Sequence, residues 1–282
     1  MKIRELYEKG LAILEKADVP DSSIDTKYII EYITGISTTR QMLEADRDVD
    51  EDTCSKYFET IDKRATRYPL QYITGEQEFM GIIFKVNEHV LIPRQDTEIL
   101  VARALEVCEN KRVLDMCTGS GCIAVSIASL GKPESVSAVD ISQEAIEVAK
   151  DNAKINNVSD KITFILSDLF DKVPKVEDDD RFDVIISNPP YIAHDTVVTL
   201  MPEVRDYEPN LALEAANEGL FFYEKIIDNS AGYLKKEGML MFEIGYEQGS
   251  AVADMMTNAG FTQVQVVKDY AGLDRVVCGK KF

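Results

Sequence analysis

The chain has 282 residues, enough for one large domain or two ordinary ones, and its 45% hydrophobic content allows a sizeable core. Fifty acidic residues against 31 basic ones give a net charge of −19, which makes the chain a poor general binder of nucleic acid. No apolar run approaches the roughly 20 residues that cross a bilayer, and the charged amino terminus lacks the apolar segment of a signal peptide. We therefore expect a cytoplasmic protein with no membrane partner and a protein or small-molecule substrate.

Cysteine and histidine content argues against a metal site. Five cysteines form no Cys-x-x-Cys pair, and the chain contains only two histidines, His89 and His194. This set is too small for a zinc site of recognisable spacing, and unpaired cysteines are typical of a reducing compartment. Neither metal catalysis nor a Ser-His-Asp arrangement is expected.

The first 67 residues show the apolar spacing of helices. A stripe at three- and four-residue intervals begins at Ile3, a second pattern runs from Asp25 to Ile33 and ends at Gly35, and a third helix is predicted from about Glu51 to Arg67. The simplest interpretation is a small helical bundle, and the more specific one is a docking domain for a macromolecular substrate over residues 1–75.

The composition changes after Tyr68-Pro69. β-Branched and aromatic residues from Glu78 to Ile92 predict a β-hairpin with its turn at Asn87-Glu88, which links the helices to the rest of the chain as residues 76–92. A helix is then expected to start at Pro93.

Strands alternate with helices from residue 111 onwards, which predicts a doubly wound α/β domain over residues 93–282. In such sheets ligands bind at the carboxyl ends of the strands, so the residues that follow each strand are the candidates for a site. The closing strands are predicted at 239–244, 261–267 and 275–278.

The strand that ends at Met116 leads into the small residues Cys117–Gly121 and then a helix over 122–130. Glycines in such a turn let the backbone approach a ligand, and the helix start presents free N–H groups. The pattern is neither Gly-x-Gly-x-x-Gly nor a P-loop, which weakens a dinucleotide or nucleoside triphosphate interpretation.

Two carboxylates end the next two strands, predicted at 135–139 and 162–166. Asp140 lies 19 residues beyond Gly121, the spacing of an acid that accepts hydrogen bonds from ribose hydroxyls. Asp168 could accept a hydrogen bond from an adenine amino group. Either residue alone is compatible with an ordinary turn, but both at matched strand ends indicate a nucleoside-bearing ligand.

Asn188-Pro189-Pro190-Tyr191 follows the fourth strand, predicted at 181–187. The prolines stop the strand, and the four letters alone are compatible with a simple turn. A rigid side-chain amide beside a cofactor also suits a substrate with a planar NH2 group. These residues leave open whether that group belongs to a nucleobase or to an amide.

The motifs Asp115–Gly121, Asp140, Ser167–Phe170 and Ser187–Tyr191 resemble those of class I S-adenosylmethionine-dependent methyltransferases, which implies a Rossmann-like, mostly parallel seven-stranded sheet. Further stretches resemble the peptide chain release factor glutamine N(5)-methyltransferases: PLQYITGEQEFMG (69–81), VNEHVLIPRQDTE (86–98), YEPNLALEAANEGLFFY (207–223), FEIGYEQG (242–249) and DYAGLDRVV (269–277).

This resemblance implies methyl transfer from S-adenosylmethionine, without a metal, to the glutamine side-chain amide in the Gly-Gly-Gln loop of class I peptide chain release factors. It also assigns residues to three roles. The methionine part of the cofactor would contact Cys117, Thr118, Gly119, Ser120 and Gly121. Its ribose would contact Asp140, and its adenine would contact Asp168 and Leu169. Asn188 would also contact the cofactor. The catalytic residues would be Asn188, Pro189 and Tyr191. The substrate glutamine would contact these three residues and Pro190, with Arg94, Thr97 and Glu98 near the site.

Several positions depart from the family pattern. Cys117 stands where many members have glycine, Gln95 replaces a frequent proline, and Leu169 stands where some members have tryptophan. Ala215-Ala216-Asn217 lacks a common glycine pair. The departures at Cys117, Gln95 and Leu169 remove no polar group that the proposed transfer needs.

Two alternatives belong to other classes. An amino-methyltransferase of adenine or guanine in DNA or RNA would use the same pocket, but the net charge of −19 and the lack of a basic recognition segment argue against it. An inactive cofactor-binding protein would not need Asn188, Asp140 and Asp168 together. We expect a monomer with no stable nucleic-acid partner.

Overall fold

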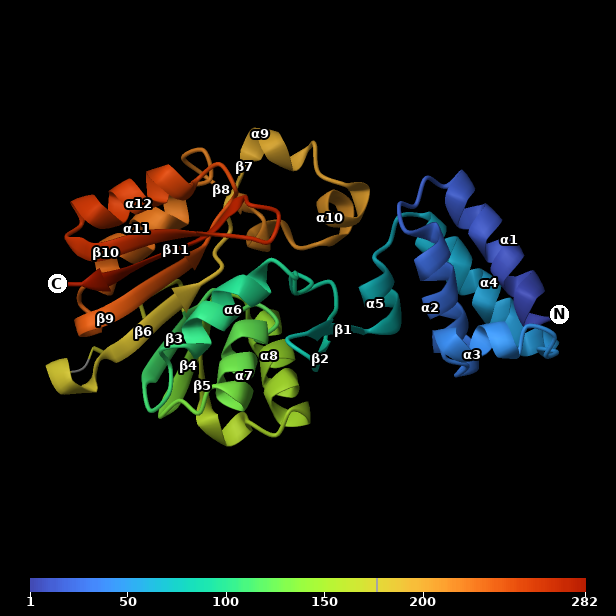
Figure 1. The fold of residues 1–282 in the computed structure, drawn as a ribbon, viewed down its shortest axis with the longest axis horizontal. Coiled ribbons are helices and arrows are strands. Elements are labelled where there is room, and N and C mark those ends of the chain that lie inside the picture. The colour runs from blue at the N-terminus through green and yellow to red at the C-terminus, as the bar shows by residue number, and fades with distance from the viewer. Residues whose placement is uncertain (176) are drawn as a thin grey trace. The chain divides into compact units, whose positions relative to one another are not determined.

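The computed structural model describes residues 1–175 and 177–282, and the chain divides into two compact units (Figure 1). The helical unit comprises Met1–Gly75 together with Met201–Tyr207. The sheet unit comprises Glu76–Leu200 and Glu208–Phe282.

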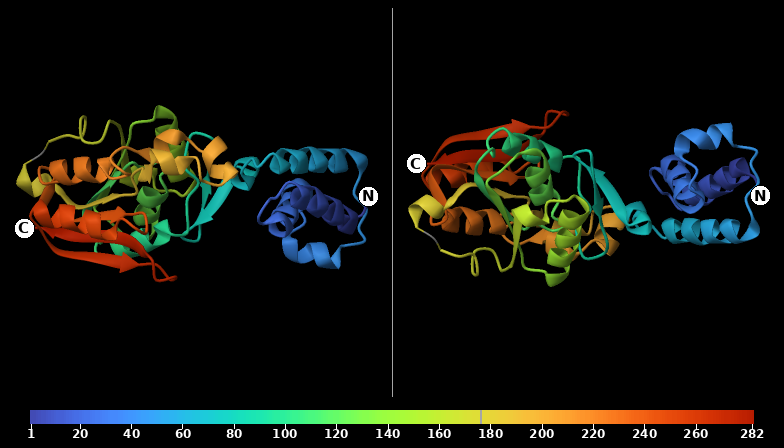
Figure 2. Two further views of the ribbon diagram at one scale, coloured as in Figure 1. Left: turned by 90° about the horizontal axis from the view of Figure 1, so that it is seen from above. Right: turned by 90° about the horizontal axis from the view of Figure 1, so that it is seen from below.

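The helical unit is a bundle whose main helices pack around one apolar core (Figures 1 and 2). Its core includes Leu6, Ile29 and Tyr57, all fully buried, as the apolar spacing predicted. Gly35 ends the second helix in a left-handed conformation with φ of 69°, which glycine adopts without strain. The helices are α1 (Ile3–Lys16), α2 (Ser22–Thr34), α3 (Thr38–Leu43), α4 (Glu51–Ala65), α5 (Leu70–Thr74) and α10 (Pro202–Tyr207).

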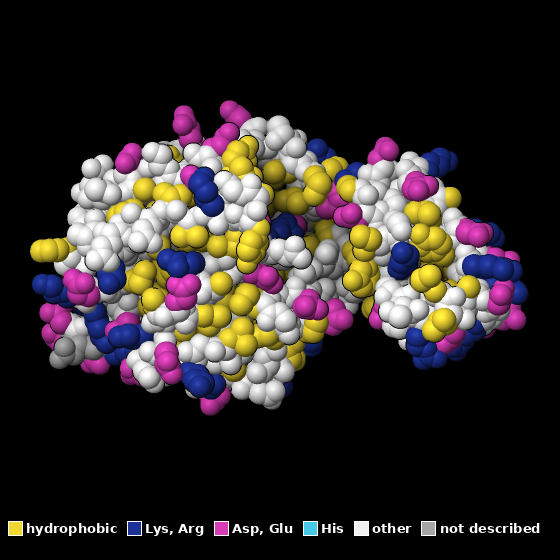
Figure 3. All heavy atoms as spheres, in the orientation of Figure 1, with side chains coloured by type: hydrophobic (Ala, Val, Ile, Leu, Met, Phe, Trp, Pro, Cys, Tyr) yellow, Lys and Arg dark blue, Asp and Glu magenta, His cyan; other side chains and the backbone are white. Residues whose placement is uncertain are grey.

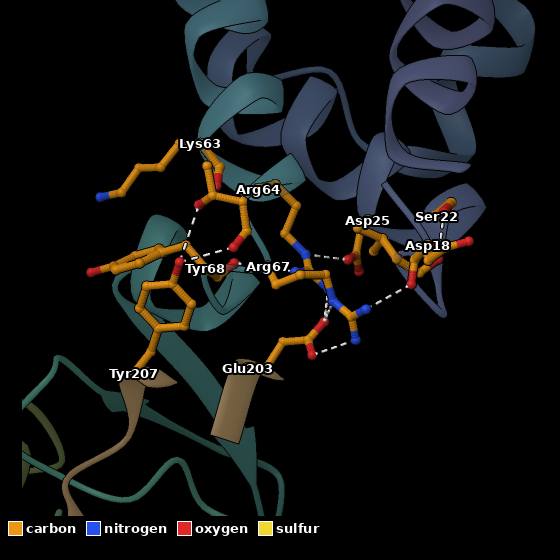
Figure 4. Close-up of polar contacts among 11 residues, drawn as sticks. Asp18, Ser22, Asp25, Lys63, Arg64, Arg67, Tyr68, Glu203 and Tyr207 are labelled. Atoms are coloured by element: carbon orange, nitrogen blue, oxygen red, sulfur yellow. Dashed lines mark hydrogen bonds and ion pairs between the residues drawn. The ribbon is translucent and has the colours of Figure 1, made fainter. Parts of the chain in front are cut away.

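Buried ion pairs join α10 to the rest of the helical unit (Figure 4). Both carboxylate oxygens of Glu203 accept hydrogen bonds from Arg67, each at 2.6 Å, and Oε1 also accepts one from Arg64 at 3.0 Å. Arg64 in turn donates to Asp25 at 2.7 Å, and the Tyr207 hydroxyl donates to the Thr66 carbonyl at 2.8 Å. Two arginines therefore share two carboxylates in a largely buried, charge-balanced cluster.

Replacing Glu203 by glutamine should lower the free energy of unfolding of the helical unit by roughly 2 kcal/mol, because two buried guanidinium groups lose a charged acceptor. Urea unfolding followed by circular dichroism measures this difference. Asp206→Asn is the matched control, since Asp206 lies on the same short helix and pairs with Arg205 on the surface. Equal stability of the two variants would contradict the importance of the cluster.

In the described part of the chain, seven strands form one sheet in the order β10-β11-β9-β6-β3-β4-β5. The strands from β9 to β5 are parallel, and β11 pairs antiparallel with both β9 and β10. This confirms the predicted Rossmann-like, mostly parallel seven-stranded sheet. The strands are β3 (Arg112–Met116), β4 (Ser135–Asp140), β5 (Ile162–Leu166), β6 (Phe182–Ser187), β9 (Leu234–Glu243), β10 (Phe261–Lys268) and β11 (Asp274–Lys281).

Helices cover both faces of this sheet (Figure 1). Successive strand residues point to opposite faces, so Met241 packs with one apolar cluster and its neighbours Leu240 and Phe242 with the other. One face is covered by α6 (Thr97–Leu105), α7 (Cys122–Leu130) and α8 (Gln143–Ile155), and the other by α11 (Phe221–Ser230) and α12 (Gly249–Asn258). Other elements of the described residues are β7 (Ile192–Ala193), α9 (His194–Val197), β8 (Glu214–Ala215) and 3-10 turns at Ser159–Lys161, Asp178–Asp180 and Asn210–Ala212.

The predicted hairpin turn was wrong. Strands β1 (Glu76–Phe79) and β2 (Ile82–Lys85) pair antiparallel around Met80-Gly81, and Asn87-Glu88 lies beyond the hairpin. Both turn residues have positive φ, 54° and 72°, as a two-residue type I′ turn requires, and Gly81 meets that requirement without strain. The helix predicted to start at Pro93 begins four residues later, at Thr97.

Candidate active site

A pocket of about 350 Å³ lies in the sheet unit, beside residues that follow β3, β4, β5 and β6. This is where a doubly wound sheet binds its ligand, and the volume suits a small-molecule cofactor. The pocket brings together most of the residues that the sequence indicated. Its lining includes Arg94, Thr97, Cys117, Thr118, Gly119, Ser120, Asp140, Asp168, Leu169, Asn188 and Pro190.

Four predicted residues lie outside this lining. A side chain at Gly121 would place its Cβ 2.9 Å from the Cβ of Ala149, so this glycine permits close packing of α7 on α8. Glu98 accepts a hydrogen bond from the Met80 N–H at 2.7 Å and therefore faces the hairpin. The other two residues, Pro189 and Tyr191, follow Asn188 in the chain.

The loop after β3 is fixed by its neighbours. The Gly119 N–H donates to Asp140 Oδ2 at 2.8 Å, and the Thr118 N–H donates to the Val139 carbonyl at 2.9 Å. Cys117 has φ of 62°, a left-handed conformation that costs an L-residue roughly 1 kcal/mol. The loop thus adopts the backbone that glycine favours, although this chain has cysteine at that position.

Asp115 holds the loop through hydrogen bonds, a role that its place in the motif Asp115–Gly121 did not reveal. Its Oδ2 accepts hydrogen bonds from the Thr118 hydroxyl at 2.5 Å and from the Ala124 N–H at 3.2 Å. Complete burial raises the pKa of Asp115 to about 7, although these hydrogen bonds oppose the shift. The signal in the sequence was an acid within an otherwise apolar strand, Val113–Met116.

The raised pKa of Asp115 predicts a pH-dependent contribution to stability. Between an unfolded pKa near 3.9 and the folded pKa of about 7, the folded state binds a proton that the unfolded state lacks, so this contribution falls as the pH rises. Urea unfolding measures the free energy of unfolding of the native chain and of Asp115→Asn. Between pH 5.5 and 6.5, the stability of the native chain relative to that of the variant should fall by about 1 kcal/mol. A constant difference would contradict the raised pKa.

Asp140 ends β4 and lines the pocket. Its Oδ1 accepts a hydrogen bond from the Ser142 N–H at 2.9 Å, and its Oδ2 holds Gly119. Burial raises the pKa of Asp140, and these N–H donors oppose the rise. Each carboxylate oxygen retains capacity for a second hydrogen bond, such as one from a ribose hydroxyl. Asp168 is exposed, and Leu169 beside it is half-buried.

Asn188 lies opposite the start of α6. Its Nδ2 donates to Thr97 Oγ1 at 3.2 Å, which leaves the amide oxygen available to a ligand. The Tyr191 hydroxyl donates to Glu243 Oε1 at 3.2 Å, and the Tyr191 carbonyl accepts a hydrogen bond from the Gln248 side chain at 3.1 Å. Packing of the Tyr191 ring on a substrate amide stays a prediction.

Two further buried carboxylates were missed by the sequence analysis. Glu208 forms an ion pair with Arg94 of the pocket and accepts a hydrogen bond from the Ile92 N–H at 3.4 Å. Glu243 is 1% exposed, and burial raises its pKa to about 7, although the neighbouring Thr97 and Tyr191 hydroxyls oppose this rise. Glu243 ends an apolar strand as Asp140 does, a signal that could have identified it; Glu208 lies in a segment without periodicity.

Residues 1–175 and 177–282 contain no group of three or more His, Cys, Asp or Glu side chains placed to hold a metal ion. Over the same residues, no helix is both long and apolar enough to cross a membrane.

Comparisons with known proteins agree with this geometry. A family model described as the methyltransferase small domain matches residues 95–203, and one described as the PrmC N-terminal domain matches residues 5–75. The solved structure of a methyltransferase from Pyrococcus furiosus has a TM-score of 0.54 at 18% identity, covering 72% of this chain and 90% of that one. At this identity the likeness shows the fold alone.

Sequence relatives are more specific. The release factor glutamine methyltransferase of Fusobacterium nucleatum is 41% identical over 281 residues, which cover 98% of this chain and 78% of that protein. The release factor glutamine methyltransferase of Clostridium acetobutylicum is 38% identical over 280 residues, 98% of each chain. The family that the sequence motifs predicted is thereby confirmed: this chain belongs to the release factor glutamine methyltransferases.

Proposed function

We propose that this chain transfers the methyl group of S-adenosylmethionine to the side-chain amide nitrogen (N5) of the glutamine in the Gly-Gly-Gln motif of class I peptide chain release factors. The observation that supports this most is the side chain of Asn188. It sits in the pocket wall with its N–H group bonded to Thr97, so that its oxygen can accept a hydrogen bond from an NH2 group.

The residues that line the pocket offer a partner for each part of the cofactor. Its small-residue loop and the acid at the end of β4 provide a cradle for the methionine part and acceptors for the ribose hydroxyls. Asp168 and Leu169 are available to the adenine, one as a polar acceptor and the other as an apolar surface. When bound, the cofactor supplies a methyl group on a positively charged sulfur.

An amide nitrogen is a weak nucleophile because its lone pair is delocalised into the carbonyl. We assign Asn188 Oδ1 and the Pro189 carbonyl as acceptors of the two amide N–H groups of the substrate, which orients the nitrogen towards the methyl group. Holding the reacting atoms at about 3–3.5 Å can supply several kcal/mol of the barrier. The nitrogen loses one proton to solvent after transfer, because an N-protonated amide is a strong acid.

Methylation of a nucleobase amine is the rival assignment. The net charge of −19 disfavours it, and acidic and basic side chains are interspersed on the face shown in Figure 3. Incubating the chain with cofactor labelled on its methyl group, and with either a release factor or DNA and RNA, separates the two. Label should appear in the release factor and be absent when the Gly-Gly-Gln glutamine is replaced by alanine. Label in nucleic acid alone would overturn the proposal.

A further inference from the structure

Glu243 lies outside the lining of the pocket, at the carboxyl end of β9 and beside β6. These strands run parallel, and Phe242 is paired with Ser187. The residues that follow, Glu243 and Asn188, are therefore neighbours at the carboxyl ends of the two strands. The Glu243 side chain is almost fully buried, and it does not line the pocket. Its influence on a substrate must therefore pass through other side chains.

Two hydroxyl groups connect Glu243 to the Asn-Pro-Pro-Tyr motif. The Tyr191 hydroxyl donates to Oε1 at 3.2 Å, and the Thr97 hydroxyl is a neighbour of this carboxyl that lowers its pKa. Thr97 is 2% exposed, and its Oγ1 accepts the N–H of Asn188 at 3.2 Å. Glu243 is thus one hydrogen bond away from Tyr191, and Thr97 is a neighbour of both Glu243 and Asn188.

The direction of these bonds matters because a hydroxyl group has one proton. If Thr97 donates that proton to the carboxylate, it can only accept from Asn188. The Asn188 amide must then turn its NH2 group to Thr97 and its oxygen away from it. Above its pKa of about 7, Glu243 is an ionised carboxylate that accepts hydrogen bonds only, and in this form it sets the direction of the bonds from Thr97 and Tyr191.

We propose that Glu243 is a positioning residue, whose carboxylate accepts the protons of the Thr97 and Tyr191 hydroxyls and thereby fixes the Asn188 amide with its oxygen towards the substrate. This inference rests on the proposed function, in which that oxygen accepts a hydrogen bond from the NH2 group of glutamine. Without the carboxylate, Thr97 can donate to the Asn188 oxygen. The Asn188 amide is then flipped, and its NH2 group faces the NH2 group of the substrate glutamine.

The surroundings of Glu243 fit an acceptor role. The nearby cation, Arg275, is engaged by Asp269 at 3.2 Å and by Asp96 at 3.1 Å. Among the described residues, Glu243 Oε2 has no hydrogen-bond partner. The Tyr191 hydroxyl is the donor that this buried carboxyl has, and no ion pair of the described residues includes Glu243.

Steady-state kinetics on a release factor test the inference. Glu243→Gln should lower kcat by about 10- to 100-fold and leave cofactor affinity within a few-fold, because glutamine has the same size but can donate as well as accept. Thr97→Val should lower kcat similarly, and Thr97→Ser should retain more activity than Thr97→Val. The double variant Thr97→Val with Glu243→Gln should have a kcat only slightly below that of either single variant.

Met241→Ala is the matched control, since Met241 is buried on the same face of β9, two residues earlier. It should lower thermal stability and leave kcat unchanged. An unchanged kcat in Glu243→Gln, or a loss in the double variant equal to the product of the single losses, would overturn the inference. No methylation by the native chain would instead overturn the proposed function.

Hydrogen exchange provides a readout that needs no substrate. The Asn188 side-chain NH2, identified in nuclear magnetic resonance spectra by its absence in Asn188→Asp, should exchange slowly with water in the native chain and in Met241→Ala. It should exchange at least about tenfold faster in Glu243→Gln, since the bond to Thr97 is no longer fixed in one direction. Equal exchange rates in all three would overturn the inference even if the methylation assay fails.

Discussion

Replacing Asn188 by alanine is expected to lower the rate of methyl transfer at saturating cofactor by about 10²- to 10³-fold, the usual effect of removing one group that orients or stabilises the reacting atoms. The amide oxygen is the side-chain acceptor that the pocket offers at the end of β6, and alanine leaves the substrate nitrogen free to rotate. The affinity for the cofactor, measured by calorimetry, should change only a few-fold, because Asp140 and the loop after β3 remain intact.

A surface asparagine provides the control for Asn188. Asn217 lies in the same unit, and its side chain donates to Glu224 on the exposed surface, so Asn217→Ala should keep the native rate. A different result for Asn188→Ala, with weakened cofactor binding and unchanged turnover at saturation, would make Asn188 a cofactor ligand and remove it from the transfer step.

Local sequence patterns predicted the sheet unit well because its strands are buried and its helices start and stop at distinct signals. The strand Ile162–Leu166 and the helix Cys122–Leu130 have the bounds that the sequence predicted. The segment 194–218 has few periodic signals in its sequence. Its short helix α10 belongs to the helical unit because Glu203 meets Arg67, 136 positions away in sequence, which no local pattern could show.

The same distinction separates the site residues that the sequence found from those it missed. Asp140 and Asn188 come at the carboxyl ends of apolar strands, so their position can be predicted from the neighbouring sequence. Glu208 acquires its role from Arg94, 114 positions away, and Glu243 from Tyr191, 52 positions away. Such buried carboxylates become visible only when the fold brings their donors to them.

Replacing Asp140 by alanine should raise the dissociation constant of the cofactor by roughly 100-fold or more. Hydrogen bonds from two ribose hydroxyls to a charged acceptor contribute about 1.5–3 kcal/mol each, and both would be lost. The N–H groups of Gly119 and Ser142 would also lose their acceptor, which frees the loop that lines the pocket. Isothermal titration calorimetry with S-adenosylmethionine measures the change.

Asp140→Asn separates the charge from the shape of this side chain. It keeps one acceptor oxygen and the size of the native side chain. We therefore expect its affinity for the cofactor to be about tenfold below that of the native chain and above that of Asp140→Ala. Asp168→Asn should weaken binding less than Asp140→Asn, because Asp168 is exposed and water competes for its hydrogen bonds. If Asp140→Ala bound the cofactor with native affinity, Asp140 would serve only to hold the loop, and the ribose would have to be recognised by other groups in the pocket.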